Sequence, residues 1–95
     1  MSQATFWLAS PFRDWVGQRI LTLSWEGSFT VRSFWERLGV EYPTLSRNLP
    51  REGLTDEAMS QMVAVIMDGE ILRLDSLIRS GAKVDVLTPL SGGAR

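Results

Sequence analysis

The sequence predicts an α+β fold in which a mixed β-sheet is crossed by one main helix. Three observations predict it. Segments with the alternation of strands lie at both ends of the 95-residue chain, and a stretch in its middle has helical spacing. Between two apolar runs, Asp68-Gly69 is the dipeptide that a type I′ hairpin turn prefers. The length suits a single domain, expected to span residues 1–89, with residues 90–95 as a flexible tail.

Two strands are expected near the N-terminus. Residues 4–9 and 19–26 alternate side chains with the two-residue period of a strand. One face of the first run carries Thr5 and Trp7, and one face of the second carries Ile20, Thr22 and Ser24. The opposite, more apolar faces of the two runs carry Phe6, Leu8, Leu21, Leu23 and Trp25.

Residues 11–18, between these strands, are expected to form a loop. The loop contains Phe12 and Trp15, which are unusually large for turn positions. Tryptophans pack in cores more often than they stack on nucleic-acid bases, but a small domain has difficulty burying four tryptophans and four phenylalanines. Because exposed apolar patches tend to mark interfaces, we expect Phe12 and Trp15 to contribute to a partner interface.

One helix is predicted in the middle of the chain. Thr30 suits its N-cap, because a hydroxyl can accept a hydrogen bond from a first-turn N–H, and Gly39 suits the left-handed position that follows a helix. The i, i+3, i+4, i+7 spacing of the apolar residues puts them on one stripe, formed by Val31, Phe34, Trp35 and Leu38.

The connection after this helix is less regular. Residues 44–49 are compatible with a short helical turn stopped by Pro50, and residues 56–62 with another capped by Thr55. Residues 50–53 between them are expected to form a mobile loop.

The last third of the sequence predicts three more strands. Residues 63–67 and 70–74 flank the hairpin turn, and residues 83–88 alternate again after a break at Gly81. Pro89 ends this last strand because it has no N–H to donate. The chain then continues as Leu90-Ser91-Gly92-Gly93-Ala94-Arg95.

This C-terminal pattern resembles the small sulfur carriers of the ThiS and MoaD kind, which are ubiquitin-like β-grasp proteins. The resemblance rests on the hairpin, a Leu-rich turn, Gly81 before the last strand, and then Pro89 to Gly93. It implies the ubiquitin-like β-grasp fold with a flexible Gly-Gly tail. Family members normally end at the second glycine, whereas this chain continues with Ala94 and Arg95.

The resemblance also implies a function. In such a carrier, a partner enzyme adenylates the C-terminal glycine with ATP, and a sulfur donor then converts it to a thiocarboxylate for a sulfur-accepting enzyme. The glycine is Gly93 here, so a protease, by analogy a metalloprotease, would first cut between Gly93 and Ala94. Leu90, Ser91 and Gly92 would thread into the partner, since Thr88 to Gly93 spans roughly 17 Å when extended.

Composition excludes several other functions. The chain has no cysteine and no histidine, so we expect no catalytic residue, no metal site and no bound cofactor, and therefore not an enzyme. Ten basic residues are scattered against eleven acidic ones, which argues against nucleic acid as a partner. No run is long enough to span a membrane, and we expect a cytoplasmic protein.

A second hypothesis comes from another class. The chain would then be a β-grasp interaction module or assembly subunit that uses its sheet and an aromatic patch, with an inactive tail. The sequence does not distinguish among sulfur acceptors such as a molybdopterin precursor, a thiazole, cysteine or a tRNA base, and it leaves the oligomeric state and the identity of the partners open.

Overall fold

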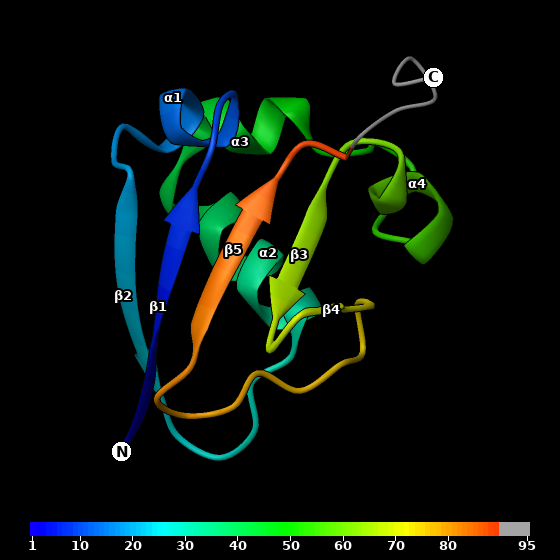
Figure 1. The fold of residues 1–95 in the computed structure, drawn as a ribbon. Coiled ribbons are helices and arrows are strands. Elements are labelled where there is room, and N and C mark those ends of the chain that lie inside the picture. Colours follow the sequence, from blue (N-terminus) through cyan, green and yellow to red (C-terminus); the bar gives the residue numbers. More distant parts are fainter. Residues whose placement is uncertain (90–95) are drawn as a thin grey trace.

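The computed structural model describes residues 1–89, so the predicted tail at residues 90–95 lies outside the described residues. Five strands form one sheet in the order β2-β1-β5-β3-β4 (Figure 1). β1 and β5 pair in parallel, and the other neighbours pair antiparallel, so the sheet is mixed as predicted. The strands are β1 Ser2–Leu8, β2 Ile20–Trp25, β3 Ala64–Met67, β4 Glu70–Ile71 and β5 Lys83–Leu87.

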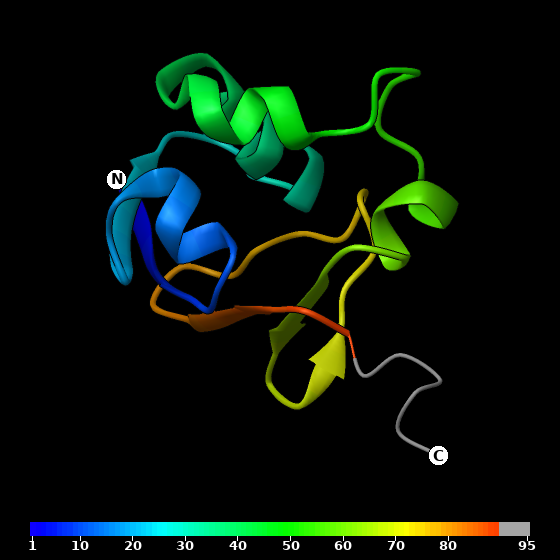
Figure 2. The ribbon, with the colours of Figure 1, turned by 90° about the horizontal axis from the view of Figure 1, so that it is seen from above.

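One face of the sheet packs against the helices. Figure 2 shows α2 and α3 on a single side of the strands. The predicted apolar faces of the first two strands are confirmed, since Phe6, Leu8, Leu21, Leu23 and Trp25 are all buried. The helices are α1 Phe12–Val16, α2 Val31–Glu41, α3 Pro43–Asn48 and α4 Asp56–Ser60.

The main helix, α2, begins where the sequence predicts. The Thr30 hydroxyl accepts a hydrogen bond from the backbone N–H of Ser33 over 3.1 Å, so Thr30 is its N-cap. Phe34 stacks on Phe6 of β1 with ring centroids 4.5 Å apart. The predicted core stripe is confirmed, because all four of its members are buried: Val31, Phe34, Trp35 and Leu38.

The end of α2 differs from the prediction. Gly39 lies inside the helix, which continues to Glu41. The helix ends at Tyr42, whose extended backbone (φ −126°, ψ 95°) precedes Pro43. A residue before proline is disfavoured in the helical region, so Pro43, and not Gly39, determines the end.

The segment predicted as a loop at residues 11–18 contains the short helix α1, so that prediction is wrong. The N–H of Trp15 donates to the Pro11 carbonyl over 3.0 Å. Gly17, in the left-handed region with φ 85°, follows the helix. Phe12 is buried against Trp35, with ring centroids 5.9 Å apart. Burial of Phe12 gives a local helix the tertiary support that its five residues lack alone.

The two short helices of the connection and the hairpin are present as predicted, but their boundaries differ by one to three residues. Thr55 caps α4 by accepting from Ala58 N over 3.1 Å. At the hairpin, Asp68 (φ 55°) and Gly69 (φ 80°) both have the positive φ that a type I′ turn requires. β4 ends at Ile71 instead of residue 74 because the chain after it turns toward α2 and α4. Residues 50–53 contain a turn, and their mobility stays a prediction.

Candidate partner-binding site

The second face of the sheet, here called the outer face, carries the candidate site. Among the described residues no helix lies over it, so the strands of Figure 1 are seen directly in front of α2. Strand alternation sends every second side chain to this face. Five apolar side chains at least partly open to solvent form what we call the apolar patch: Trp7, Ile20, Ile66, Ile71 and Leu87.

The strand register brings the apolar patch together. Ile20 pairs with Trp7 across β2 and β1, and Ile66 pairs with Ile71 across β3 and β4. Asp85 of the middle strand joins the two pairs, since it lies opposite both Trp7 and Ile66. Neighbouring strands are about 4.8 Å apart, so this row crosses the sheet over about 19 Å.

The apolar patch lies at the end of the sheet where β5 ends. β5, which leads to the tail, is the middle strand. Leu87, its last residue, is 37% exposed and belongs to the apolar patch. The other end of the outer face is polar, with Thr5 opposite Thr22 and Lys83. A partner bound to the apolar patch would therefore be next to the end of β5, which precedes the tail in the sequence.

The site residues predicted from the sequence have different outcomes. Phe12 is 1% exposed, so the expectation that it forms a surface patch is wrong. Trp15 is half-buried, with its ring against Phe12 at a centroid distance of 5.5 Å, and its place in an interface stays a prediction. The tail calls lie outside the described residues: Leu90, Ser91, Gly92, Gly93 and Ala94.

The apolar patch was missed as a site, although the sequence contains a signal for it. Trp7 and Ile20 lie in the positions of the alternation that should face solvent, where polar side chains are expected. Their exposures are 39% and 40%. Apolar residues on the solvent side of two strands indicate a surface that is covered part of the time.

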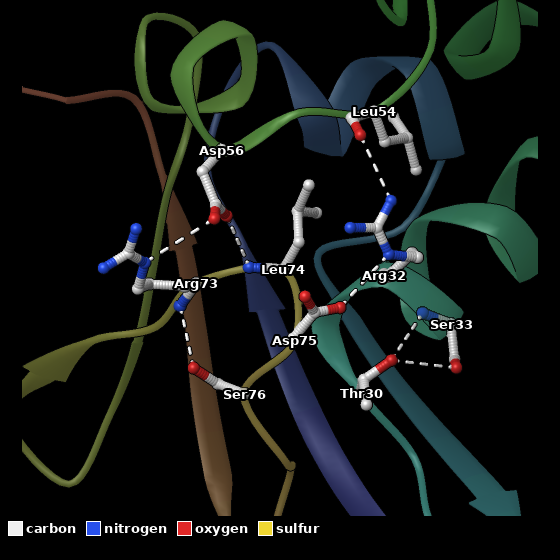
Figure 3. Close-up of polar contacts among 9 residues, drawn as sticks. All are labelled: Thr30, Arg32, Ser33, Leu54, Asp56, Arg73, Leu74, Asp75 and Ser76. Atoms are coloured by element: carbon white, nitrogen blue, oxygen red, sulfur yellow. Dashed lines mark hydrogen bonds and ion pairs between the residues drawn. The ribbon is translucent and has the colours of Figure 1, made fainter.

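A polar cluster holds the segment after β4 against the N-terminus of α2 (Figure 3). Asp56, in the first turn of α4, accepts a hydrogen bond from Leu74 N over 2.8 Å. Arg32 donates to the carbonyl of Leu54 over 3.1 Å and lies 3.3 Å from Asp75. These groups are engaged with one another, so the cluster is a structural clamp.

A hollow of about 460 Å³ lies beside this clamp. Trp35 is one of its lining residues, and the buried indole Nε1 of Trp35 has no hydrogen-bond partner within the described chain. On the rim, Asp56 and Arg73 lie 3.5 Å apart as an ion pair. Because Asp56 and Arg73 pair with each other within the chain, we place the candidate site on the outer face instead.

Two classes of site are not found in the described part of the chain. Residues 1–89 contain no group of three or more acidic, histidine or cysteine side chains placed to hold a metal ion. None of the helices in the same range is long and apolar enough to cross a membrane.

A mixed sheet crossed by a single long helix, with a short hairpin at its edge, defines a ubiquitin-like β-grasp protein, which is the fold predicted from the sequence. The model of the ThiS family matches residues 11–93. The chain belongs to the ThiS family, and the resemblance to the ThiS and MoaD proteins is confirmed.

Solved structures have the same fold at low sequence identity. SAMP1 from Haloferax volcanii is 24% identical, with a TM-score of 0.72 over 96% of this chain and 99% of its own. A molybdopterin converting factor subunit 1 from Pyrococcus furiosus is 18% identical, with a TM-score of 0.74 over 95% and 100%. A chain of the Amycolatopsis orientalis BexX/CysO complex is 17% identical, with a TM-score of 0.63 over 95% and 99%.

A search among curated proteins finds no match. The family match assigns the chain to the ThiS family, and the likeness to these solved structures shows the fold that it shares with them.

Proposed function

We propose that this protein is a sulfur carrier whose C-terminal glycine, Gly93, is adenylated and then converted to a thiocarboxylate. The observation that carries the proposal is the extent of the family match, which runs to Gly93 and leaves out Ala94 and Arg95. Gly93 is the second glycine of the pair, the position that the resemblance assigns to activation. The protein would act as a co-substrate for its partners and not as an enzyme.

The chemistry needs a free carboxylate on Gly93. A carboxylate resists nucleophiles, but its oxygen can attack the α-phosphate of ATP, which gives an acyl adenylate and releases pyrophosphate. A persulfide on the sulfur donor then attacks the acyl carbon, and AMP leaves. A second thiol cleaves the resulting S–S bond, which leaves the thiocarboxylate on Gly93 and a disulfide on the donor. ATP is a substrate of the activating partner, and we propose no cofactor bound to this chain.

Any residue attached to Gly93 blocks the first step. With Ala94 in place, the Gly93 carbonyl is an amide and has no carboxylate oxygen to adenylate. We therefore propose that a protease, by analogy a metalloprotease, removes Ala94-Arg95. Leu90, Ser91 and Gly92 would then enter the partner's active site, since glycine adopts backbone angles closed to other residues and fits a narrow channel.

The apolar patch is the proposed docking surface for the activating partner. It lies at the end of the outer face where β5 leads to the tail, and it carries Trp7 and Leu87. Binding there would bury apolar surface that is open in the free chain. The sulfur-accepting enzyme would use the same tail, in the cytoplasm, where ATP-dependent activation takes place.

The alternative is an interaction module that uses the outer face while the tail stays idle. The apolar patch suits this function equally well, and the chemistry of Gly93 separates the two. A chain ending at Gly93 is therefore compared with the full chain in ATP–pyrophosphate exchange with the cognate adenylating enzyme. We expect exchange only with the shortened chain.

One control chain and one further measurement complete this experiment. A chain ending at Gly92 tests whether the position of the carboxylate matters, and it should support little exchange. Intact mass after addition of a sulfur source should show the exchange of one oxygen for one sulfur only in the chain ending at Gly93. Equal exchange by the full chain would refute the removal of Ala94-Arg95, and no exchange by any of the three would favour the interaction module.

A further inference from the structure

One carboxylate interrupts the apolar patch. Asp85 lies between Trp7 and Ile66 in the strand register, and its side chain is 37% exposed. The apolar neighbours make a partner's approach favourable, whereas burial of a bare carboxylate opposes it. The way in which Asp85 is compensated therefore decides which partner fits.

Within the free chain, Asp85 is compensated only weakly. Lys83 Nζ lies 3.8 Å from Asp85 Oδ1, well beyond the ~2.8 Å of a charge-assisted hydrogen bond. The same ammonium lies 5.0 Å from the ring centroid of Trp7. The side chain of Lys83 is 61% exposed, so this ion pair adds little stability. The hydrogen bonds to carboxylates within residues 1–89 go instead to Asp14, Asp56, Asp68 and Asp75.

A partner that covers the apolar patch removes the water that now solvates Asp85. Burying a carboxylate without a hydrogen-bond donor opposes binding more strongly than the burial of one apolar neighbour favours it. The partner must therefore bring N–H donors to Asp85. The indole face of Trp7, which already lies near an ammonium group, is the adjacent surface that attracts a cation.

We propose that Asp85 and Trp7 form a binding site, here called the arginine seat, for an arginine side chain of the activating partner. This arginine takes the place of Lys83 beside the two residues. This inference rests on the proposed function. A guanidinium group fits better than an ammonium group for two reasons. Its planar fork can donate two hydrogen bonds to the carboxylate, and its flat face can stack on the indole ring. Asp85 is then a specificity-determining residue, because a partner without such a donor would bury the Asp85 carboxylate without a hydrogen bond and would bind more weakly.

The test uses the chain ending at Gly93 and measures its affinity for the adenylating enzyme by calorimetry. Asp85→Asn keeps the shape and removes the charge, and it should weaken binding roughly tenfold, as expected for a lost charge-assisted hydrogen bond. Asp85→Leu should also weaken binding, although it makes the patch more apolar. Glu52→Gln, which removes an exposed charge in a distant loop, is the matched control and should have no effect.

Lys83→Met gives the most discriminating result, because it should strengthen binding whereas the Asp85 variants should weaken it. It removes the cation that competes for Asp85, so binding should become roughly threefold tighter. Weaker binding would show that Lys83 itself contacts the partner, and would overturn the displacement. Lys83 is exposed, so this variant tests the inference even if an Asp85 variant does not fold.

The partner's side is tested by a double-mutant cycle. Arginines on the enzyme's docking surface are changed to alanine one at a time, and one of these changes should abolish the difference between the wild-type chain and Asp85→Asn. The inference would be overturned if the Asp85→Leu chain bound as tightly as the wild type. It would also be overturned if the effects of Asp85→Asn and of each arginine change on the binding free energy were additive.

Failure of the inference and failure of the proposed function give different results. If the enzyme adenylates the shortened chain but the Asp85 variants bind normally, only the arginine seat is wrong. If the enzyme does not bind the wild-type chain, both are wrong. Sedimentation of the chain alone provides the last outcome: a dimer disrupted by Asp85→Asn would mean that a second copy covers the patch, and this too would overturn the inference.

Discussion

The two faces of the sheet are built from the same strands but have opposite roles. In β1, Phe6 is fully buried beneath α2, whereas the next residue, Trp7, is 39% exposed. In β5, Val84 and Val86 are fully buried, whereas Asp85 between them faces solvent. A single strand thus contributes alternately to stability and to the candidate partner-binding site.

The difference predicts that the two faces respond differently to substitution. On the inner face, an aromatic or aliphatic side chain has neighbours on all sides, so its loss leaves a cavity. On the outer face, the neighbours come from one side only, and truncation should affect binding more than folding. Phe34→Ala and Ile71→Ser test this separation at its two extremes, and Asp56→Ala, in the polar cluster beside the sheet, gives an intermediate value for comparison.

Phe34→Ala should have the largest effect on stability. Phe34 is fully buried, with its ring centroid 4.5 Å from that of Phe6 and 4.9 Å from that of Trp35. Its truncation should lower the free energy of unfolding by about 3–5 kcal/mol, measured by denaturant titration. Val40→Ala, on the same helix but 85% exposed, is the control and should cost less than about 0.5 kcal/mol. A loss below about 1 kcal/mol for Phe34→Ala would contradict the assignment of this helix face.

Asp56→Ala should have an intermediate effect. It removes the acceptor of the 2.8 Å hydrogen bond from Leu74 N and leaves that part-buried N–H unpaired. Because Asp56 is 44% exposed, water can replace part of the loss, and we expect about 1 kcal/mol. Glu57→Ala removes a neighbouring charge from the same helical turn and should cost less. Equal losses in the two variants would show that charge near the start of α4, and not the hydrogen bond, is what matters.

Ile71→Ser should leave stability almost unchanged and reduce binding. Ile71 is 72% exposed and lies on the outer face opposite Ile66, so the free energy of unfolding should change by less than about 0.5 kcal/mol. Affinity for the adenylating enzyme should fall several-fold, because the apolar patch loses one of its members. Thr22→Ser, at the polar end of the outer face, is the control for both measurements. A stability loss as large as that of Asp56→Ala would place Ile71 with the core.

The sequence by itself determined the local features of this protein. The phase of β1 and β2 follows from alternation, and the hairpin turn from Asp68-Gly69. The start of α2 follows from Thr30, whose hydroxyl accepts a hydrogen bond from the N–H of Ser33 three residues later. Each of these signals involves residues only a few positions apart, so each can be read without knowing the fold.

The tertiary structure decided what depends on residues far apart in the chain. The helix α1 is stabilised by the packing of Phe12 against Trp35. Because Trp35 is distant in the sequence, the residues around Phe12 do not predict this contact. The apolar patch exists because β5 inserts between β1 and β3, which places Asp85 beside Trp7 and Ile66. Alternation specifies which side of a strand a residue faces, but strand order and register specify its neighbours, and these depend on the burial of the whole core.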